Sequence, residues 1–250
     1  MGSPNTHRQL VVDLVARTGA AVLFVNYTRS PEAQFPVPIQ QAHAAVEWLH
    51  HAGHAAELKL DPARVAFAGD SAGGAMAAAV NILSLRQARH DLLPRGQVLF
   101  YPVTDLSRES CTYGTFKNGD FPSPLLSPPY LGLMVSAGPG LSAAALRWMI
   151  AAFVPNTADR RNPLASPLLA SDAELRAMPE TTVLVAEVDP LREEGEAFAR
   201  RLTTLGVRTT LLRAEGTIHD CAMLNALAHT PATRAIVLLA ADALRRAFGA

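Results

Sequence analysis

The stretch Arg64-Val-Ala-Phe-Ala-Gly-Asp-Ser-Ala-Gly-Gly74 decides the fold of this 250-residue chain. Its apolar first half and its small-residue second half predict a short buried strand that turns sharply into a helix. The turn contains the pattern G-x-S-x-G, in which a serine is lifted out of the sheet on a strained backbone. Side chains two residues before and after Ser71 would crowd such a turn, so we expect Gly69 and Gly73 both to be required there.

The helix that follows Ser71 bears on the chemistry of this turn. Its unpaired N–H groups and the positive end of its dipole face the serine, and the N–H of Ala72 is placed to receive a developing oxyanion. The same pattern also occurs in glycine-rich turns that carry no chemistry. Here the later residues favour a nucleophile, because a candidate acid and a candidate base follow in the order Ser, Asp, His.

A serine nucleophile needs a base within hydrogen-bond reach and an acid that orients the base. Of the eight histidines, His219 lies in the segment 215–220 directly after the last predicted strand, at the sheet edge where Ser71 is expected. His90 and His229 lie on predicted helices or at their ends. We therefore expect His219 to be the base, with a structural histidine as the alternative.

Asp189 is the expected acid because it follows the predicted strand that ends at Ala186, at the same sheet edge. Glu187 is its rival, and an ordinary helix cap is the alternative role of Asp189. A carboxylate in the turn before a helix is kept ionised by the helix dipole and by backbone donors. In the catalytic interpretation, Asp189 orients His219 while Ser71 attacks a carbonyl and forms an acyl-enzyme that water hydrolyses.

Strands that alternate with helices predict an α/β fold with a mostly parallel sheet flanked by helices. The predicted strands are 20–26, 64–68, 97–101, 181–186 and 207–212. The predicted helices are 5–17, 40–53, the helix after Ser71, 143–153, 191–205 and 231–248. We expect one domain over residues 1–250, in which residues 106–169 form a lid or cap over the strand ends. A long disordered loop is the alternative for this insertion.

Composition restricts the class of partner. The 22 basic and 22 acidic residues balance, which argues against a nucleic-acid partner and favours a small molecule. No apolar stretch reaches the roughly 18 residues of a membrane span and the first residues lack a signal pattern, so we expect a soluble, cytoplasmic protein. Cys111 and Cys221 are expected to be reduced, packed thiols.

We expect no cofactor and no metal site. The clearest histidine cluster is formed by His50, His51 and His54, which the pattern places on one helix. A zinc site needs three or four ligands, and no further ligand accompanies these residues. The cluster is therefore interpreted as part of a solvated helix.

Several motifs resemble the hormone-sensitive-lipase family of α/β-hydrolases, the carboxylesterases of α/β hydrolase fold-3. The resemblance covers nearly the whole chain and is carried by Asn26-Tyr-Thr-Arg-Ser-Pro-Glu32, Gly69-Asp-Ser-Ala-Gly-Gly74, Tyr101-Pro102, Asn162-Pro-Leu-Ala-Ser-Pro167, Asp189-Pro-Leu191 and Ile218-His-Asp220. It implies that Ser71, Asp189 and His219 are nucleophile, acid and base. It also implies that the substrates are esters of small or medium carboxylic acids.

The sequence departs from the family at its front. The family carries a His-Gly-Gly-Gly loop whose N–H groups form most of the oxyanion hole, and this sequence contains no such loop. Residues 1–7 resemble the segment that follows the loop, which implies that the N-terminal strands of the fold are missing and that 20–26 and 64–68 lose a shared neighbour. An exposed edge there favours a homo-oligomer.

Catalysis is affected as well, because losing one oxyanion donor costs about 10²–10³ in turnover. The alternative function is therefore a catalytically silent α/β-hydrolase-like binding protein or a truncated fragment.

Overall fold

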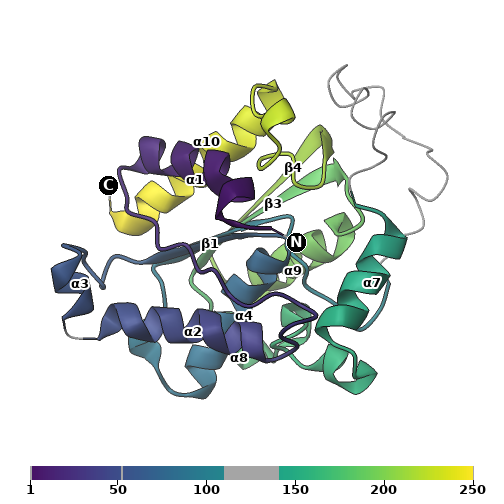
Figure 1. Cartoon of the computed structure of the whole chain (residues 1–250), viewed down its shortest axis with the longest axis horizontal. Helices are drawn as coiled ribbons and strands as arrows, with labels where there is room; N and C mark the ends of the chain where they lie inside the picture. Colours follow the sequence, from purple (N-terminus) through teal and green to yellow (C-terminus); the bar gives the residue numbers. More distant parts are fainter. Residues whose placement is uncertain (1, 52, 110–140, 250) are drawn as a thin grey trace.

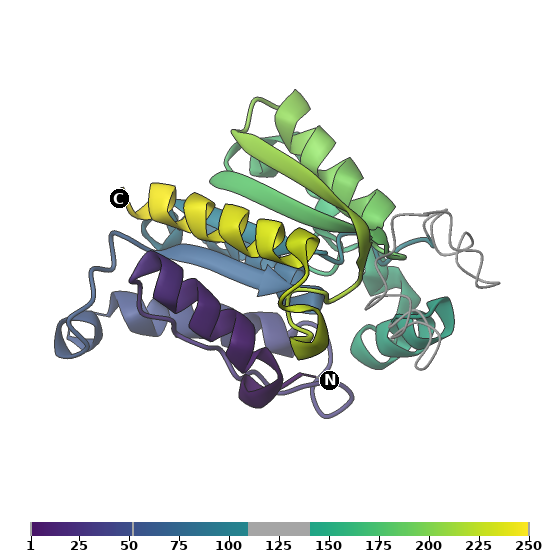
Figure 2. The same ribbon diagram turned by 90° about the horizontal axis from the view of Figure 1, so that it is seen from above.

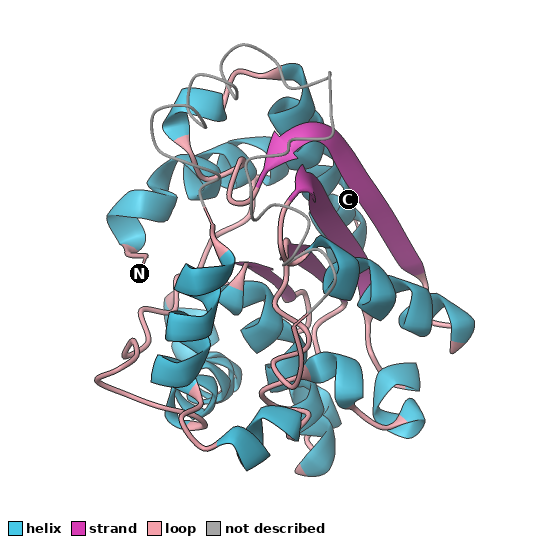
Figure 3. Cartoon of the chain, turned by 90° about the vertical axis from the view of Figure 1, so that its right-hand side faces the viewer, coloured by secondary structure: helices cyan, strands magenta, loops and turns pink. Residues whose placement is uncertain are grey.

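A parallel sheet lies at the centre of the computed structural model, which describes residues 2–51, 53–109 and 141–249 (Figure 1). The strands follow one another across the sheet in chain order: β1 (Ala66–Asp70), β2 (Gly96–Phe100), β3 (Glu180–Val188) and β4 (Thr209–Ile218). Figure 3 shows these strands with helices on both sides of them. Because every neighbouring pair is parallel, the carboxyl ends of the strands meet at one edge.

Helices connect the strands and cover the sheet. The α-helices among the described residues are α1 (Pro4–Thr18), α2 (Val37–His50), α3 (His54–Glu57), α4 (Ala72–Arg86), α7 (Ala143–Phe153), α8 (Asp172–Arg176), α9 (Arg192–Thr204) and α10 (Pro231–Phe248). Short 3₁₀ turns lie at His90–Leu92, Thr157–Arg161, Pro167–Leu169 and Asn225–Leu227. The helices predicted over 143–153 and 231–248 are thus confirmed. No helix in the described parts of the chain is long and apolar enough to cross a membrane.

Two hydrophobic layers form the core, one on each face of the sheet. Val98 and Phe100 of β2 pack in the layer with residues of α1 and α10, whereas Leu99 between them packs with α4 and α9. Figure 2 shows α9 and α10 on opposite sides of the sheet. Side chains of a strand alternate between faces, so a sheet covered on both faces requires the continuous apolar runs that the sequence contains.

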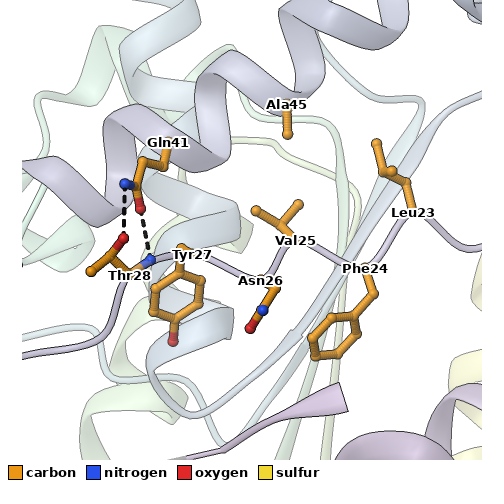
Figure 4. Close-up of a pocket in the computed structure, with 8 residues that line it drawn as sticks. All are labelled: Leu23, Phe24, Val25, Asn26, Tyr27, Thr28, Gln41 and Ala45. Carbon is orange, nitrogen blue, oxygen red and sulfur yellow. Dashed lines mark hydrogen bonds between the residues drawn. The ribbon is translucent and has the colours of Figure 1, made fainter.

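Residues 20–26 do not form the predicted buried strand. No residue of this segment is assigned to a strand, and Val22, Leu23 and Phe24 expose 46%, 47% and 38% of their surfaces. The segment is extended beside a shallow pocket of about 290 Å³, and Figure 4 shows Leu23 and Val25 directed toward α2 with Phe24 on the opposite side. This alternation is strand-like. The difference lies in backbone pairing: among the described strands β1 pairs only with β2, and 20–26 forms no ladder with the other edge of β1.

The last strand is longer than predicted. The sequence predicts a strand over 207–212 that is followed by a loop at 215–220, whereas β4 continues to Ile218. An irregularity in the β3–β4 register between Ala186 and Val188 accompanies this extension, and Gly216 adopts a positive φ of 68° there. Such a bulge re-aims the end of a strand, which here brings the residue after Ile218 to the carboxyl edge of the sheet.

Candidate active site

Ser71 lies at the sharp turn between β1 and α4, as predicted. Its φ of 52° and ψ of −117° place it in a backbone region that non-glycine residues rarely occupy. Hydrogen bonds on both sides hold this conformation: the N–H of Ser71 donates to the carbonyl of Phe100 at 2.8 Å, and the N–H of Val103 donates to the carbonyl of Ser71 at 3.2 Å. The segment after β2 therefore fixes the turn.

The expected need for glycine is confirmed before Ser71 but not after it. A Cβ on Gly69 would lie 2.3 Å from the carbonyl carbon of Gly73, which no real contact allows. A Cβ on Gly73 would meet nothing closer than an Asp70 oxygen at 3.8 Å, so the expectation for Gly73 is wrong. Gly74 is instead the tight position, because its Cβ would lie 3.0 Å from Pro102. Gly74 thus allows the loop that contains Pro102 to pack against the start of α4.

The structure brings the three predicted side chains together at the carboxyl edge of the sheet. His219 Nε2 lies 3.1 Å from Ser71 Oγ, and His219 Nδ1 lies 2.7 Å from Asp189 Oδ2. His219 follows β4 and Asp189 follows β3, so two strand ends supply the pair while the end of β1 supplies the serine. The side chains of His219 and Asp189 are only 5% and 0% exposed. A serine–imidazole–carboxylate chain of this kind can activate a hydroxyl group for attack on a carbonyl.

The charges around His219 favour its protonated form. Burial would lower the pKa of His219, but the negative charges of Asp189, Asp220 and Asp70 and the Asp189 hydrogen bond outweigh burial and raise this pKa to about 9. Asp220 Oδ1 lies 3.5 Å from His219 Nε2. An imidazole that has accepted the proton of Ser71 is therefore stabilised electrostatically.

Asp189, rather than Glu187, is the carboxylate beside His219. Its second oxygen accepts the N–H of Leu191 at 2.8 Å, so Asp189 also orders the turn before α9. Glu187 Oε2 instead accepts the N–H of Gly216 at 2.6 Å and holds the irregular part of β4. Asp189 is therefore not the N-cap of α9, which is Leu191; one carboxylate oxygen orders the turn before the helix and the other contacts His219.

Tyr101 is a residue that the sequence reasoning did not assign to the site. Its hydroxyl accepts the N–H of Ala222 at 2.9 Å and lies 3.1 Å from Cys221 Sγ, while its ring meets the His219 ring edge-on at 5.5 Å. Tyr101 therefore supports the turn that carries His219. Burial raises the pKa of the Cys221 thiol to about 11, so this cysteine is a neutral packed thiol, as expected. Cys111 lies outside the described residues.

Glu194 is a second residue that the sequence reasoning missed. It is 2% exposed, and its Oε1 accepts the N–H groups of Thr104 at 2.7 Å and Asp105 at 3.3 Å. Burial raises the pKa of Glu194 to about 8. The carboxyl group thus joins α9 to the segment after β2, the segment that also holds Ser71. Its place five residues after Asp189 was the only signal in the sequence.

The histidine cluster does not lie on one helix, contrary to the prediction. α2 ends at His50, His51 follows it, and His54 begins α3. The ring of His54 stacks on Trp48 at 4.4 Å, and Nδ1 of His54 lies 2.8 Å from the Trp48 carbonyl oxygen. Within 2–51, 53–109 and 141–249, no group of three or more His, Cys, Asp or Glu side chains is placed to hold a metal ion.

Comparison with known proteins places this geometry in a family. A family model described as alpha/beta hydrolase fold matches residues 1–223. The chain belongs to the α/β hydrolase fold family. The relatives of this α/β-hydrolase include an esterase from Gibberella moniliformis, 37% identical over 99% of this chain and 71% of its own length. An ethyl acetate hydrolase from Pseudomonas putida is 34% identical over 88% of this chain and 62% of its own.

Solved structures agree with this assignment. The crystal structure of carboxyl esterase 2 from the mycorrhizal fungus Tuber melanosporum matches with a TM-score of 0.88 and 39% identity. The match covers 99% of this chain and 73% of that one. The resemblance to the carboxylesterases of fold-3 drawn from the sequence is thereby confirmed, and so is the α/β-hydrolase fold. The chain is a carboxylesterase-type hydrolase of this family.

Proposed function

We propose that this α/β-hydrolase cleaves esters of small and medium carboxylic acids through an acyl-enzyme on Ser71. The observation that carries the proposal is the hydrogen-bonded chain from Ser71 through His219 to Asp189, with 3.1 Å and 2.7 Å separations. The named activities of the relatives, which include ethyl acetate hydrolysis and arylesterase activity, support small acyl groups as the substrate class.

The reaction follows from the positions of these atoms. Ser71 Oγ forms a bond to the ester carbonyl carbon while its proton passes to His219 Nε2, and the carbonyl oxygen becomes an oxyanion. The tetrahedral species then collapses, the alcohol oxygen takes the proton from His219, and the alcohol leaves. Water then attacks the acyl carbonyl carbon while its proton passes to His219 Nε2; the second tetrahedral species collapses, Ser71 Oγ takes the proton back as its bond to the acyl carbon breaks, and the carboxylic acid leaves. Asp189 keeps the imidazole oriented and stabilises its positive charge throughout.

Ala72 is the proposed oxyanion donor. It is the first residue of α4, so its N–H has no acceptor within the helix, and the positive end of the helix dipole lies at the same place. One donor supplies part of an oxyanion hole, and each further donor contributes about 10²–10³ in turnover.

Residues 106–169 are proposed to form the lid of a single domain over 1–250. The described parts of this segment pack beside the site: Leu141 and Leu146 contact Leu191, which lies two residues after Asp189. Leu106 and Val154 form a second small cluster at its base. A cap in this position would limit the size of the acyl group, which supports short esters as substrates.

The decisive experiment measures hydrolysis of p-nitrophenyl acetate and p-nitrophenyl butyrate by the purified chain and by its Ser71→Ala variant. We expect hydrolysis by the chain and a fall to background in the variant, because the nucleophile is removed. Equal rates in both proteins would refute the proposal. If neither protein exceeds background while the chain is folded, the alternative of a silent binding protein is supported instead.

A further inference from the structure

A second histidine–aspartate pair lies next to the first. His7 Nε2 is 3.0 Å from Asp70 Oδ2, and the two side chains are only 15% and 17% exposed. Asp70 directly precedes Ser71 at the end of β1, and His7 lies in the second turn of α1. Neither residue has a part in the mechanism proposed above.

The surroundings of His7 favour a protonated imidazole. Nε2 faces the Asp70 carboxylate, and Nδ1 lies 3.1 Å from the carbonyl oxygen of Ser3. Both partners only accept hydrogen bonds, so a ring with a proton on each nitrogen, which is cationic, donates to both of them. The Thr6 hydroxyl lies 2.9 Å from Nδ1 and 3.0 Å from the Ser3 carbonyl oxygen, and beside a cationic ring it donates to that carbonyl. The Asp70 hydrogen bond correspondingly raises the pKa of His7 above 6.5.

The position of His7 is fixed by its own helix. Ser3 and Thr6 form a capping box at the start of α1, in which each side chain bonds the backbone N–H of the other residue. The ring of Phe24 lies 5.9 Å from the ring of His7, whose side chain is largely buried. A shielded ion pair is screened less by salt than an exposed one, so its charge acts on nearby groups.

Asp70 acts on the catalytic imidazole. The acids whose charge raises the pKa of His219 are Asp189, Asp220 and Asp70, whereas its other close neighbours, Tyr101 and Cys221, are neutral. His7 is the only cation within ion-pair distance of Asp70 among the described residues. The charge of His7 also acts on Asp220, where it opposes the rise in the carboxyl pKa that burial causes. The net charge beside His219 therefore depends on whether His7 carries its proton.

We propose that His7 is a positioning residue that serves as the counter-ion of Asp70 beside Ser71 and so limits the negative charge acting on His219. The pair then sets how basic the catalytic imidazole is: enough to accept the serine proton, but still unprotonated in a useful part of the pH range. The inference rests on the proposed hydrolase function for its kinetic consequence, although the charge coupling itself does not.

The test compares His7→Gln with Asp70→Asn. Gln keeps a donor for Asp70 without the charge, and Asn removes the carboxylate charge with little change of shape. His7→Gln is expected to move the acid limb of kcat/KM to higher pH, because Asp70 is left uncompensated and His219 holds its proton more tightly. Asp70→Asn is expected to move this limb to lower pH. Each shift should be on the order of half a pH unit. A purely structural role would lower the rate in both variants without opposite shifts.

His229→Gln is the matched control, because His229 is exposed and lies outside the site. It should leave the acid limb unchanged. NMR titration of the His7 and His219 ring resonances in the same proteins reports the coupling without any need for activity, so a silent chain still decides the question. Opposite shifts of the His219 titration and a His7 pKa above 6.5 support the proposal. Shifts of equal sign, no shift, or a His7 pKa at or below 6.5 overturn it.

Discussion

Ser71 shows how much of this site depends on single residues. Its left-handed backbone at φ 52° exposes Oγ to His219, and the turn exists only because Gly69 carries no side chain. Gly73, two residues after the serine, lies in the first turn of α4 with room for a methyl group. The two glycines of the motif thus differ in physical role, so the stabilities of their alanine variants can be compared directly.

Gly69→Ala is expected to destabilise the protein by about 3 kcal/mol, because its Cβ would overlap the backbone of Gly73. Gly73→Ala is the control: it should leave the free energy of unfolding unchanged or raise it by up to about 1 kcal/mol, since alanine favours a helix. Urea denaturation measures both. Equal stability of the two variants would contradict the assignment of the steric requirement to Gly69.

Tyr101 contributes at the same scale through one hydroxyl group. In Tyr101→Phe the ring still meets His219, but the buried N–H of Ala222 loses its acceptor. An unsatisfied buried donor costs about 1–3 kcal/mol, so the melting temperature should fall. Tyr27→Phe is the control, because the Tyr27 hydroxyl makes no hydrogen bond within the described residues. A Tyr101→Phe protein as stable as this control would refute the support role.

At the scale of elements, the site depends on how α9 meets the segment after β2. Glu194 of α9 accepts two N–H groups of that segment, and Val103 in the same segment donates to the Ser71 carbonyl. Gly195, the next residue, allows α9 to pack closely on β3, because a Cβ there would lie 2.9 Å from Val185. The helix that follows Asp189 is therefore linked to the turn that carries Ser71.

The stability of this connection should depend on pH. An unfolded chain loses the Glu194 proton near pH 4.5, but the folded protein keeps it up to about pH 8. The folded state therefore binds the proton more tightly, so this contribution to stability is complete below pH 4.5 and is lost as pH rises through about 8. Glu194→Gln is neutral throughout and should remove this part of the pH dependence.

Thermal denaturation between pH 5 and about pH 8.5 tests this expectation. The melting temperature of the unmodified chain should fall with rising pH, and Glu194→Gln should show a flatter profile. Glu57→Gln changes an exposed carboxylate at the end of α3 and should retain the original slope. The same slope in all three proteins would contradict a buried, titrating Glu194.

At the scale of the whole molecule, the sheet has an open side at β1. This strand pairs only with β2 among the described strands, and the extended segment 20–26 lies nearby with three consecutive exposed apolar residues. Unpaired strand edges and exposed apolar runs promote association between chains. The expected homo-oligomer therefore stays a prediction with a defined surface.

Leu23→Lys is expected to reduce self-association, because it places a charge in the exposed apolar segment. Leu58→Lys is matched to it: Leu58 is 50% exposed and Leu23 is 47% exposed, but Leu58 lies after α3. Sedimentation velocity over a range of protein concentrations measures the effect. Association that is equally reduced in both variants, or absent in the unmodified chain, would contradict the placement of the surface at 20–26.

The parallel α/β architecture, the elbow at Ser71 and the positions of Asp189 and His219 after strand ends could all be predicted from the sequence. These features are local: each depends on hydrophobic periodicity, a glycine pattern or a position just after a strand. Chain order then brings the three strand ends to one edge, since parallel strands align their carboxyl ends.

Which distant groups meet at that edge depends on the packing of the folded chain. His7 and Asp70 are separated by 63 residues, Thr104 and Glu194 by 90, and Tyr101 and Cys221 by 120. No periodicity relates residues so far apart. The same holds for 20–26, whose apolar run is typical of a buried strand but acquires that structure only when a neighbouring strand offers hydrogen bonds to it.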